Sequence, residues 1–347
     1  MTTYTRAAVW RGAGHIAVES IPVPLPAAGD VLVRVRLATV CGSDRHTVSG
    51  RRSQPCPSIL GHETVGEVIA IGAGGARAAD GRPLGIGHRV IWSVTLPCGG
   101  CDRCRAGLSA KCRSVRKTGH EALDSGWTLS GGYAQHVLLP KGLAIAIVDD
   151  ELPDTVAAPA ACATATVMAV IERAGPLSGR RVTVIGAGML GLSAIAAAAR
   201  GGAHTVRVVD PAASRRQLAQ RFGATEASPT ADAPAGCDVL LEFSGSSAAL
   251  QAALVSLDVQ GIAVLAGTVT PGPPILVDPE MVVRRQLSIS GVHNYEPRHL
   301  SAALDFLQQT RDHFPWSELV AEPKGLDDIA ALLTQPGGTR PRCAVAP

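Results

Sequence analysis

The sequence is poor in aromatic residues, in lysine and in long apolar runs. Aromatic side chains make up 3% of the 347 residues, and nearly all of the basic charge is arginine. No segment approaches the roughly 18 to 20 apolar residues that a membrane-spanning helix needs. The first eleven residues have no charged leader followed by an apolar run, which is the pattern of a secretory signal. We therefore expect no membrane anchor and a cytoplasmic protein.

Clustered charge is also lacking. The net charge is +3, and no run of Lys or Arg is longer than a pair, so we expect no nucleic-acid partner. With 46% hydrophobic and 18% charged residues, the composition is that of a globular protein. The length allows two domains, each with its own core. The expected partners are small molecules.

The first half of the chain is typical of β-structure. Apolar residues alternate with arginine around residues 31–35, residues 65–71 form a strand-like apolar run, and residues 73–87 are typical of a surface loop. From about residue 153 the pattern changes. An alanine-rich segment at residues 157–174 indicates a helix, with a kink expected at Pro159.

Strands and helices then alternate. We expect a helix at residues 190–200 and strands at residues 181–185, 205–209, 238–243, 262–266 and 287–290. Such alternation is typical of an α/β domain with a doubly wound parallel sheet.

Four cysteines lie close together in the sequence with the spacing C-x2-C-x2-C-x7-C, namely Cys98, Cys101, Cys104 and Cys112. One loop with this spacing can wrap four thiolates around a tetrahedral zinc ion, which makes a closed, structural site. Thiols stay reduced in the cytosol, so nine cysteines there favour metal binding over disulfides. Four unrelated buried thiols are the alternative. Three further cysteines match no pattern: Cys56, Cys237 and Cys343.

A second group of metal-binding residue types is spread along the chain. Cys41 begins the segment CGSD, and His62 and Glu63 lie in GHETVG. Thiolate with imidazole is a ligand combination that suits zinc. A catalytic zinc needs three protein ligands and one open position, and Cys162 is the best candidate for the third ligand. Taken singly, each residue is as typical of a protein core, and only their occurrence together favours a site.

A glycine-rich turn, GAGMLG, follows the apolar strand and opens the next helix. This is the context in which GxGxxG binds a dinucleotide, with the pyrophosphate at the helix N-terminus. Asp210 ends the next strand, where a carboxylate can bind the adenosine ribose and repel a 2′-phosphate. NAD is therefore favoured over NADP, although Arg215 and Arg216 leave NADP open. The turn consists of Gly186, Ala187, Gly188, Met189, Leu190 and Gly191.

With these motifs in this order, the chain resembles the zinc-containing medium-chain alcohol dehydrogenase superfamily over nearly its whole length. The resemblance implies a GroES-like, β-rich catalytic domain at residues 1–155 and 293–347 and a Rossmann NAD-binding domain at residues 156–292. It also implies two zinc ions per chain, NAD as cofactor, and hydride transfer between an alcohol and the nicotinamide.

The resemblance assigns roles residue by residue. Cys41, His62 and Cys162 match the catalytic zinc ligands, and Glu63 matches an acid that can coordinate the metal transiently. Cys98, Cys101, Cys104 and Cys112 match the structural zinc site. The remaining matches are Asp44 as the partner of the zinc-bound histidine, and Ser43 and His46 as the two ends of a proton relay. Glycines 186, 188 and 191 with Met189, Leu190, Asp210 and Arg215 form the cofactor site. The resemblance also implies a homo-oligomer, a tetramer or a dimer, in which the sheets pair near residues 287–292.

Three shorter segments are similar to two smaller groups, namely RKTGHEAL, SGGYAQ and CATAT. One group is dehydrogenases of phosphonate catabolism, and the other is cyclitol dehydrogenases of aminocyclitol pathways. Both imply a polar alcohol, and His120, Glu121 and Asn294 suit a hydroxylated or anionic substrate. The polyol branch usually has Glu where this chain has Cys162, which argues against a simple polyol dehydrogenase.

Other functions remain open at this point. A simple-alcohol or a sorbitol- or threonine-type dehydrogenase would use the same site. A zinc-free quinone reductase shares the fold, and a non-catalytic NAD-binding protein would keep it. The intact set of Cys41, Ser43, His46 and His62 argues against the last two, because neither needs a metal site with a proton relay.

Overall fold

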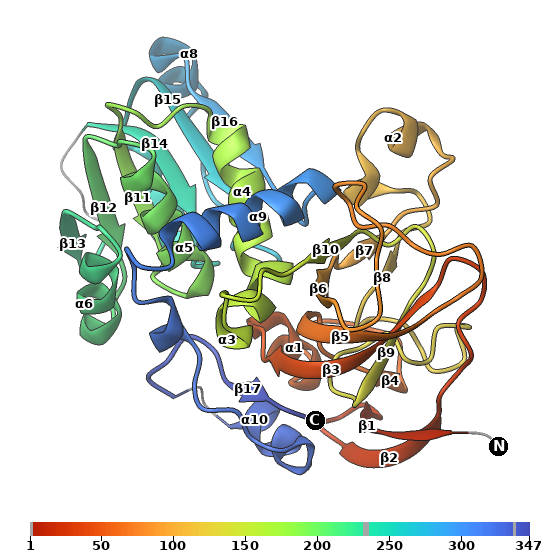
Figure 1. Cartoon of the computed structure of the whole chain (residues 1–347). Helices are drawn as coiled ribbons and strands as arrows, with labels where there is room; N and C mark the ends of the chain where they lie inside the picture. Colours follow the sequence, from red (N-terminus) through yellow and green to blue (C-terminus); the bar gives the residue numbers. More distant parts are fainter. Residues whose placement is uncertain (1–2, 232–235, 336–337) are drawn as a thin grey trace. The chain divides into compact units, whose positions relative to one another are not determined.

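A computed structural model describes residues 3–231, 236–335 and 338–347 of the chain (Figure 1). The chain forms two compact units. The first consists of Met1–Ala165, Asn294–Arg311 and Trp316–Pro347, and the second of Thr166–His293 and Asp312–Pro315. How the zinc-binding and NAD-binding roles divide between the units stays a prediction.

The first unit is built mainly from β-strands. They are β1 (Tyr4–Trp10), β2 (Ile16–Pro22), β3 (Val31–Thr39), β4 (Ser58–Ile59), β5 (Glu63–Ile71), β6 (Arg89–Trp92), β7 (Thr95–Leu96), β8 (Arg116–Lys117), β9 (His136–Leu139), β10 (Ile145–Ile147) and β17 (Ala344–Val345). Its largest sheet has the order β10-β6-β5-β3-β17, with β9 also paired to β3. A three-stranded sheet has the order β2-β1-β4, and β7 pairs with β8.

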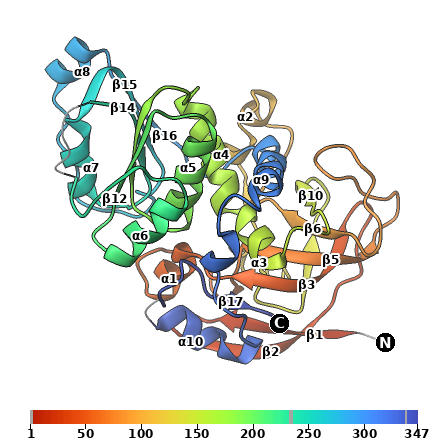
Figure 2. The same ribbon diagram turned by 60° about the vertical axis from the view of Figure 1, so that its left-hand side comes forward.

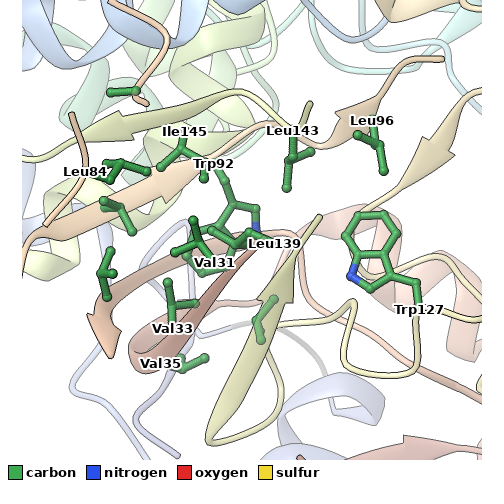
Figure 3. Close-up of a cluster of buried hydrophobic side chains, with 14 residues drawn as sticks. Val31, Val33, Val35, Leu84, Trp92, Leu96, Trp127, Leu139, Leu143 and Ile145 are labelled. Carbon is green, nitrogen blue, oxygen red and sulfur yellow. The ribbon is translucent and has the colours of Figure 1, made fainter. Parts of the chain in front are cut away.

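The alternation at the start of β3 builds the core of this unit. Val31, Val33 and Val35 are buried and point toward a cluster that contains Trp92 (Figure 3). Between them Arg34 is exposed, because successive side chains of a strand face opposite sides of the sheet. This buried cluster supports the strands from which the candidate site is built.

Short helices join the strands of the first unit. They are α1 (Gly42–Val48), α2 (Asp102–Arg105), α3 (Asp154–Ala157), α9 (Pro297–Thr310) and α10 (Ile329–Thr334), with the 3-10 helices η1 (Ser109–Lys111), η2 (Ala158–Ala161), η3 (Trp316–Leu319) and η4 (Leu326–Asp328).

The alanine-rich segment that the sequence predicted as one kinked helix is broken into three pieces. It runs through α3 and η2, and then through α4 (Ala163–Ala174) after an interruption at Cys162. Cys162 has φ −131° and ψ −65°, outside the helical region, and Pro159 has no N–H for a helical hydrogen bond. The interruption therefore comes three residues after the proline rather than at it.

Among the described residues no single helix is long and apolar enough to cross a membrane. The pair Asp154–Ala161 and Ala163–Ala174, bent by 55°, reaches that length only when both helices are counted together. Most of its apolar side chains are buried in the protein core.

The second unit contains one parallel six-stranded sheet. Its strands are β11 (Arg181–Ile185), β12 (Thr205–Val209), β13 (Glu226–Ser228), β14 (Cys237–Glu242), β15 (Leu257–Leu265) and β16 (Ser288–Gly291). The order is β13-β12-β11-β14-β15-β16, and every pair is parallel. Numbered within this unit the order is 3-2-1-4-5-6, which is that of a dinucleotide-binding Rossmann sheet. The doubly wound parallel fold expected from the sequence is confirmed.

Four helices of the second unit connect these strands, namely α5 (Met189–Arg200), α6 (Ala213–Arg221), α7 (Ser247–Leu254) and α8 (Pro279–Arg285). Figure 2 shows α5 and α6 on one side of the sheet and α7 on the other. The strand order reverses between β11 and β14. In open α/β sheets, ligands bind at the carboxyl ends of the strands beside such a reversal.

Candidate active site

Three residues distant in the sequence bring metal-binding atoms together in the first unit. One nitrogen of His62 and the sulfur atoms of Cys41 and Cys162 all lie within 4.8 Å of one another. A tetrahedral zinc with Zn–S near 2.3 Å and Zn–N near 2.0 Å holds its ligand atoms about 3.5 to 3.8 Å apart. The group therefore has the donor set of a catalytic zinc site and needs only small adjustments to reach its dimensions.

Cys41 and Asp44 are positioned by the start of α1. Cys41 precedes the helix, and its backbone N–H donates to Asp44 Oδ2 at 3.1 Å. Tyr133 donates its hydroxyl to the same oxygen at 2.8 Å. Asp44 is fully buried, so its other oxygen is fixed in direction. That oxygen faces His62.

His62 lies just before β5 and turns a different nitrogen to each neighbour. Its Nδ1 is 3.3 Å from Asp44 Oδ1, and its Nε2 is 3.4 Å from Ser43 Oγ. The contact to Asp44 falls short of normal hydrogen-bond geometry and leaves both buried atoms unsatisfied. A carboxylate behind Nδ1 fixes the tautomer in which Nε2 is free for a metal. The surroundings of His62 thus fit a zinc ligand.

The electrostatics of the site favour a thiolate at Cys41. The Cys162 thiol donates a hydrogen bond to the Cys41 sulfur, and this bond with the charge of Arg342 holds the pKa of Cys41 well below its usual range. The same bond and burial raise the pKa of Cys162, so the pair shares one proton. Thiolates are the form in which cysteine binds metals. Metal binding here should release the remaining proton.

Glu63 is close to this group but is engaged elsewhere. Its two oxygens accept hydrogen bonds from Arg342 at 2.7 and 2.9 Å, and Thr39 donates to it at 2.6 Å. Arg342 Nη2 also lies 3.8 Å from Cys41 Sγ. Sequence reasoning missed Arg342, because nothing near the C-terminus marks it. The transient metal coordination expected of Glu63 stays a prediction.

The two residues expected in the proton relay lie on the same helix. Ser43 and His46 are three positions apart on α1, so their side chains share a face. Both are partly exposed. Ser43 Oγ contacts the candidate ligand atom His62 Nε2, and His46 lies three residues farther along α1.

The four-cysteine lobe forms the loop between β7 and β8. The ligand atoms of Cys98, Cys101, Cys104 and Cys112 all lie within 4.8 Å of one another, as zinc in a closed site requires. Backbone N–H groups from Arg113 and Cys104 lower the pKa of Cys101 to about 6, which favours a thiolate. Glu296, just before α9, holds the lobe by accepting the backbone N–H groups of Ser109 and Ala110 at 3.0 and 3.1 Å. The zinc role of the lobe stays a prediction.

A cavity of about 230 Å³ lies beside the imidazole of His120. The His120 ring centroid is 5.1 Å from that of His62, so one lining residue of the cavity is a neighbour of the candidate metal group. His120 and Glu121 are among its lining residues, whereas Asn294 is not. The lining consists of Arg52, Ser53, Gln54, Pro55, Val115, Lys117, His120 and Glu121.

The glycine turn of the second unit lies at the carboxyl end of β11. Gly186 has φ +92°, and a Cβ atom on Gly191 would lie 1.8 Å from the Gly186 carbonyl oxygen. Both positions therefore require glycine. The turn opens directly into α5, which starts at Met189 and includes Leu190, while Gly188 is its N-cap. The N–H groups of the first turn of a helix have no partner within the helix and can bind an anion.

Asp210 follows β12 and is fixed against this turn. Its two carboxylate oxygens accept the backbone N–H groups of Ala187 at 2.8 Å and of Ala212 at 2.9 Å. Arg215 donates to the Ala187 carbonyl at 3.3 Å, and Arg216 donates to the Asp210 carbonyl at 2.7 Å. A carboxylate and two guanidinium groups thus border the glycine turn.

Comparison with known proteins gives matches over both units. Residues 27–149 match the alcohol dehydrogenase GroES-like domain, and residues 190–309 match the zinc-binding dehydrogenase domain. The chain is 29% identical to a 5-exo-hydroxycamphor dehydrogenase of Pseudomonas putida over 95% of each chain. It is 32% identical to an L-threonine 3-dehydrogenase of Pyrococcus horikoshii over 83% of this chain and 81% of the relative.

A solved structure agrees on the fold. The alcohol dehydrogenase of Thermotoga maritima superposes with a TM-score of 0.91 at 24% identity, over 99% of this chain and 100% of that one. Together with the domain matches, this confirms the GroES-like and Rossmann units and the enzyme class expected from the sequence. The chain belongs to the zinc-containing, nicotinamide-dependent medium-chain alcohol dehydrogenase superfamily.

Proposed function

We propose that this enzyme oxidises a polar alcohol with NAD at a zinc ion held by Cys41, His62 and Cys162. The alcohol is of the cyclitol, polyol or hydroxyalkylphosphonate kind. The observation that carries the proposal is the convergence of these three ligand atoms within 4.8 Å, with Ser43 beside them. Two sulfurs and one imidazole leave one position of a tetrahedral zinc open for substrate.

The residues of the chain supply the proton path. A zinc ion in this site would act as a Lewis acid that lowers the pKa of a hydroxyl group. In this proposal Ser43 Oγ, which contacts His62 Nε2, would accept the hydroxyl proton in a hydrogen bond, and His46 on the same helix would pass it to solvent. Asp44 holds the His62 ring from behind, so that the metal site does not shift during the reaction.

Asp210 and the glycine turn support NAD as the hydride acceptor. A carboxylate held at this point can accept hydrogen bonds from the two hydroxyls of the adenosine ribose. The extra phosphate of NADP would face a like charge there. Arg215 and Arg216 both donate to backbone carbonyls in the structure, which lessens their ability to attract that phosphate.

The cavity beside His120 supports a polar substrate. Its lining includes Arg52, Gln54 and Lys117, and only two of its eight residues are apolar. A hydrophobic alcohol would leave these polar groups without partners, which costs binding free energy. Two relatives act on unlike alcohols by name, hydroxycamphor and threonine, so a simple-alcohol or threonine-type dehydrogenase is the second candidate.

The test is a substrate screen with zinc-loaded enzyme that follows NADH formation. Cyclitols, sugar alcohols, hydroxyalkylphosphonates, threonine and simple aliphatic alcohols are each offered with NAD and with NADP. The proposal expects the highest kcat/KM with NAD and a polar alcohol. A clear preference for aliphatic alcohols would refute the substrate class, and the absence of any alcohol oxidation would refute the function.

The enzyme is further proposed to work in the cytoplasm as a homo-oligomer, a tetramer or a dimer. Nine cysteines without a disulfide among the described residues suit a reducing compartment. The edge strand β16 carries Ile289, which is 37% exposed, and α8, which precedes it in the chain, carries Val283, which is 76% exposed. An exposed strand edge with apolar neighbours is a surface that a second copy can cover.

A further inference from the structure

We propose that the substrate of this enzyme carries an oxyanion group, a carboxylate or a phosphonate, which binds between Arg52 and Lys117 in the cavity beside His120. This inference rests on the proposed function and narrows it, because a neutral cyclitol or sugar alcohol would not use the two cations. The oxyanion group would lie at one end of the substrate and the reacting hydroxyl at the other.

The charges around the cavity do not cancel. Glu121 is the acidic residue of the lining. Its oxygens accept hydrogen bonds from the Arg116 guanidinium at 3.0 Å and from the Lys117 backbone N–H at 2.9 Å. Arg116 therefore neutralises it. Within the described parts of the chain, neither Arg52 nor the Lys117 ammonium has a carboxylate at ion-pair distance. Two positive charges thus remain for a ligand.

Both cations are partly shielded from water by the cavity. Arg52 and Lys117 are each half-buried, and burial lowers the pKa of Lys117, with the charges of Arg52 and Lys111 adding to the effect. Holding cations of like charge in such a place costs free energy unless an anion joins them. Arginine also suits an oxyanion geometrically, because its planar guanidinium can bind two oxygens at once.

His120 connects the cavity with the candidate metal group, because it lines the cavity and its ring is a neighbour of the His62 ring. Gln54 Nε2 donates to the Gly119 carbonyl at 3.1 Å, which leaves Gln54 Oε1 to accept from His120 Nδ1 at 2.7 Å. This hydrogen bond places the proton of neutral His120 on Nδ1. The Nε2 atom of His120 can then accept a hydrogen bond from a substrate hydroxyl. The ring lies 5.1 Å from that of His62. The proposal therefore requires a small hydroxy acid to extend past His120, with its hydroxyl at the metal ligands and its oxyanion at the cations.

The two cations come from segments that already serve the site. Arg52 lies in the loop after α1, the helix that carries Ser43 and His46. Lys117 lies in β8, where it pairs with Thr95 of β7, and the four-cysteine lobe is the loop between these two strands. A metal that closes the lobe would therefore fix the position of Lys117.

The experiment compares matched charged and neutral substrates in the zinc-loaded enzyme. One pair is 2-hydroxypropylphosphonate and its dimethyl ester, and the other is 3-hydroxybutanoate and its methyl ester. The two pairs distinguish a phosphonate site from a carboxylate site. Arg52→Gln and Lys117→Gln remove one cation each. Arg51→Gln is the control, because Arg51 is an exposed arginine next to Arg52 that does not line the cavity.

We expect the wild-type enzyme to prefer the anion of at least one pair over its ester. Each cavity variant should lower the anion-to-ester ratio of kcat/KM by about ten- to a hundred-fold, the range for losing a hydrogen bond to a charged group. Arg51→Gln should leave the ratio unchanged. A wild-type preference for both esters, or an equal loss with anion and ester, would overturn the proposal while leaving the dehydrogenase function intact.

A binding measurement separates this inference from the reaction. Methylphosphonate and acetate are titrated into the same four proteins by calorimetry, so that no turnover is needed. We expect one of these anions to bind to wild type and to Arg51→Gln, and to bind about tenfold or more weakly to both cavity variants. That result supports the oxyanion site even if no alcohol is oxidised. Equal affinity in all four proteins, or no binding to wild type, contradicts it.

Discussion

Glu63 and Arg342 form a buried, two-pronged ion pair beside Cys41, although 279 positions separate them in the sequence. The guanidinium Nε and Nη2 atoms donate to the two carboxylate oxygens at 2.7 and 2.9 Å. Glu63 is fully buried and Arg342 is 8% exposed. The pair fastens the C-terminal segment to the strand that begins after His62, and it places a positive charge next to the Cys41 thiolate.

Removal of one member of this pair should destabilise the protein strongly. We expect Arg342→Met to lower the free energy of unfolding by about 3 to 5 kcal/mol, because Glu63 is left as a buried charge without its partner. Burial already raises the pKa of Glu63, and the arginine opposes that shift, so Glu63 should take up a proton in the variant. Urea unfolding of the zinc-loaded proteins measures the change.

The double variant Glu63→Gln, Arg342→Met is the control for this prediction. It removes both charges. Its loss of unfolding free energy should therefore be smaller than the sum of the losses in the single variants Glu63→Gln and Arg342→Met. Strictly additive losses would show that the two residues act independently and would contradict the ion-pair account.

The local motifs were predictable because the members of each lie close together in sequence. The four-cysteine spacing, GHE and the glycine turn each lie within a few residues, and the structure brings the members of each motif together. The fold class was predictable for a similar reason, since strand and helix periods alternate along residues 181–290. Cys162 was predicted because a catalytic zinc needs a third ligand and because the family resemblance matched it, since one cysteine in an alanine-rich helix has no pattern of its own.

The supporting contacts could not be predicted, because they depend on the folded chain. Arg342 meets Glu63, Tyr133 meets Asp44, and Gln54 meets His120 across long stretches of sequence. The break at Cys162 was missed for a different reason. Alanine, which favours helix, recurs along that segment on both sides of Cys162, and only the packed structure shows where the helix is interrupted.

Cofactor choice should depend on the charge of Asp210. Asp210→Asn keeps one oxygen as an acceptor for a backbone N–H of Ala187 or Ala212, while Asp210→Ser removes most of that contact as well. Loss of the like-charge repulsion should shift preference toward NADP by about ten- to a thousand-fold, or about 1 to 4 kcal/mol. The ratio of kcat/KM for NAD and NADP measures this. Comparable use of both cofactors by the wild-type enzyme would contradict the role of Asp210.

Lys117 predicts an alkaline limit for binding of an anionic substrate. Its pKa is lowered by burial and by the charges of Arg52 and Lys111, so its charge is lost at a lower pH than that of an ordinary lysine. Glu121 is paired with Arg116, and burial lowers the pKa of His120 well below its usual value, so His120 stays neutral in that range. Lys111 is the other facing lysine, and burial lowers its pKa as well, so a Lys117 variant is needed to assign the titration. KM for 2-hydroxypropylphosphonate should therefore rise about tenfold as pH increases through this pKa.

Lys117→Arg is the matched variant for the pH profile. A guanidinium stays charged throughout the alkaline range, so the rise in KM should disappear, and the dimethyl ester should show no such rise with either enzyme. If KM for 2-hydroxypropylphosphonate rose at the same alkaline pH in Lys117→Arg, the titrating group would be another residue, and the prediction would be wrong.

The edge strand β16 should carry the contact between subunits. Ile289→Arg adds a charge to its exposed face and should shift the protein toward a smaller species in sedimentation velocity at micromolar concentration. Val255→Arg is the control, since Val255 is 60% exposed at the end of α7 and not on this strand. A wild-type protein that sediments as a monomer would rule out the oligomer.

The zinc content of wild type, Cys162→Ser and Cys101→Ser tests the central claim most directly. The account predicts two zinc ions per chain in wild type. Cys162→Ser should hold one zinc, remain folded and lose dehydrogenase activity, whereas Cys101→Ser should fold poorly, because a structural zinc contributes folding free energy. Wild-type protein with one zinc or none, or Cys162→Ser with two zinc ions and full activity, would contradict the assignment of the metal site.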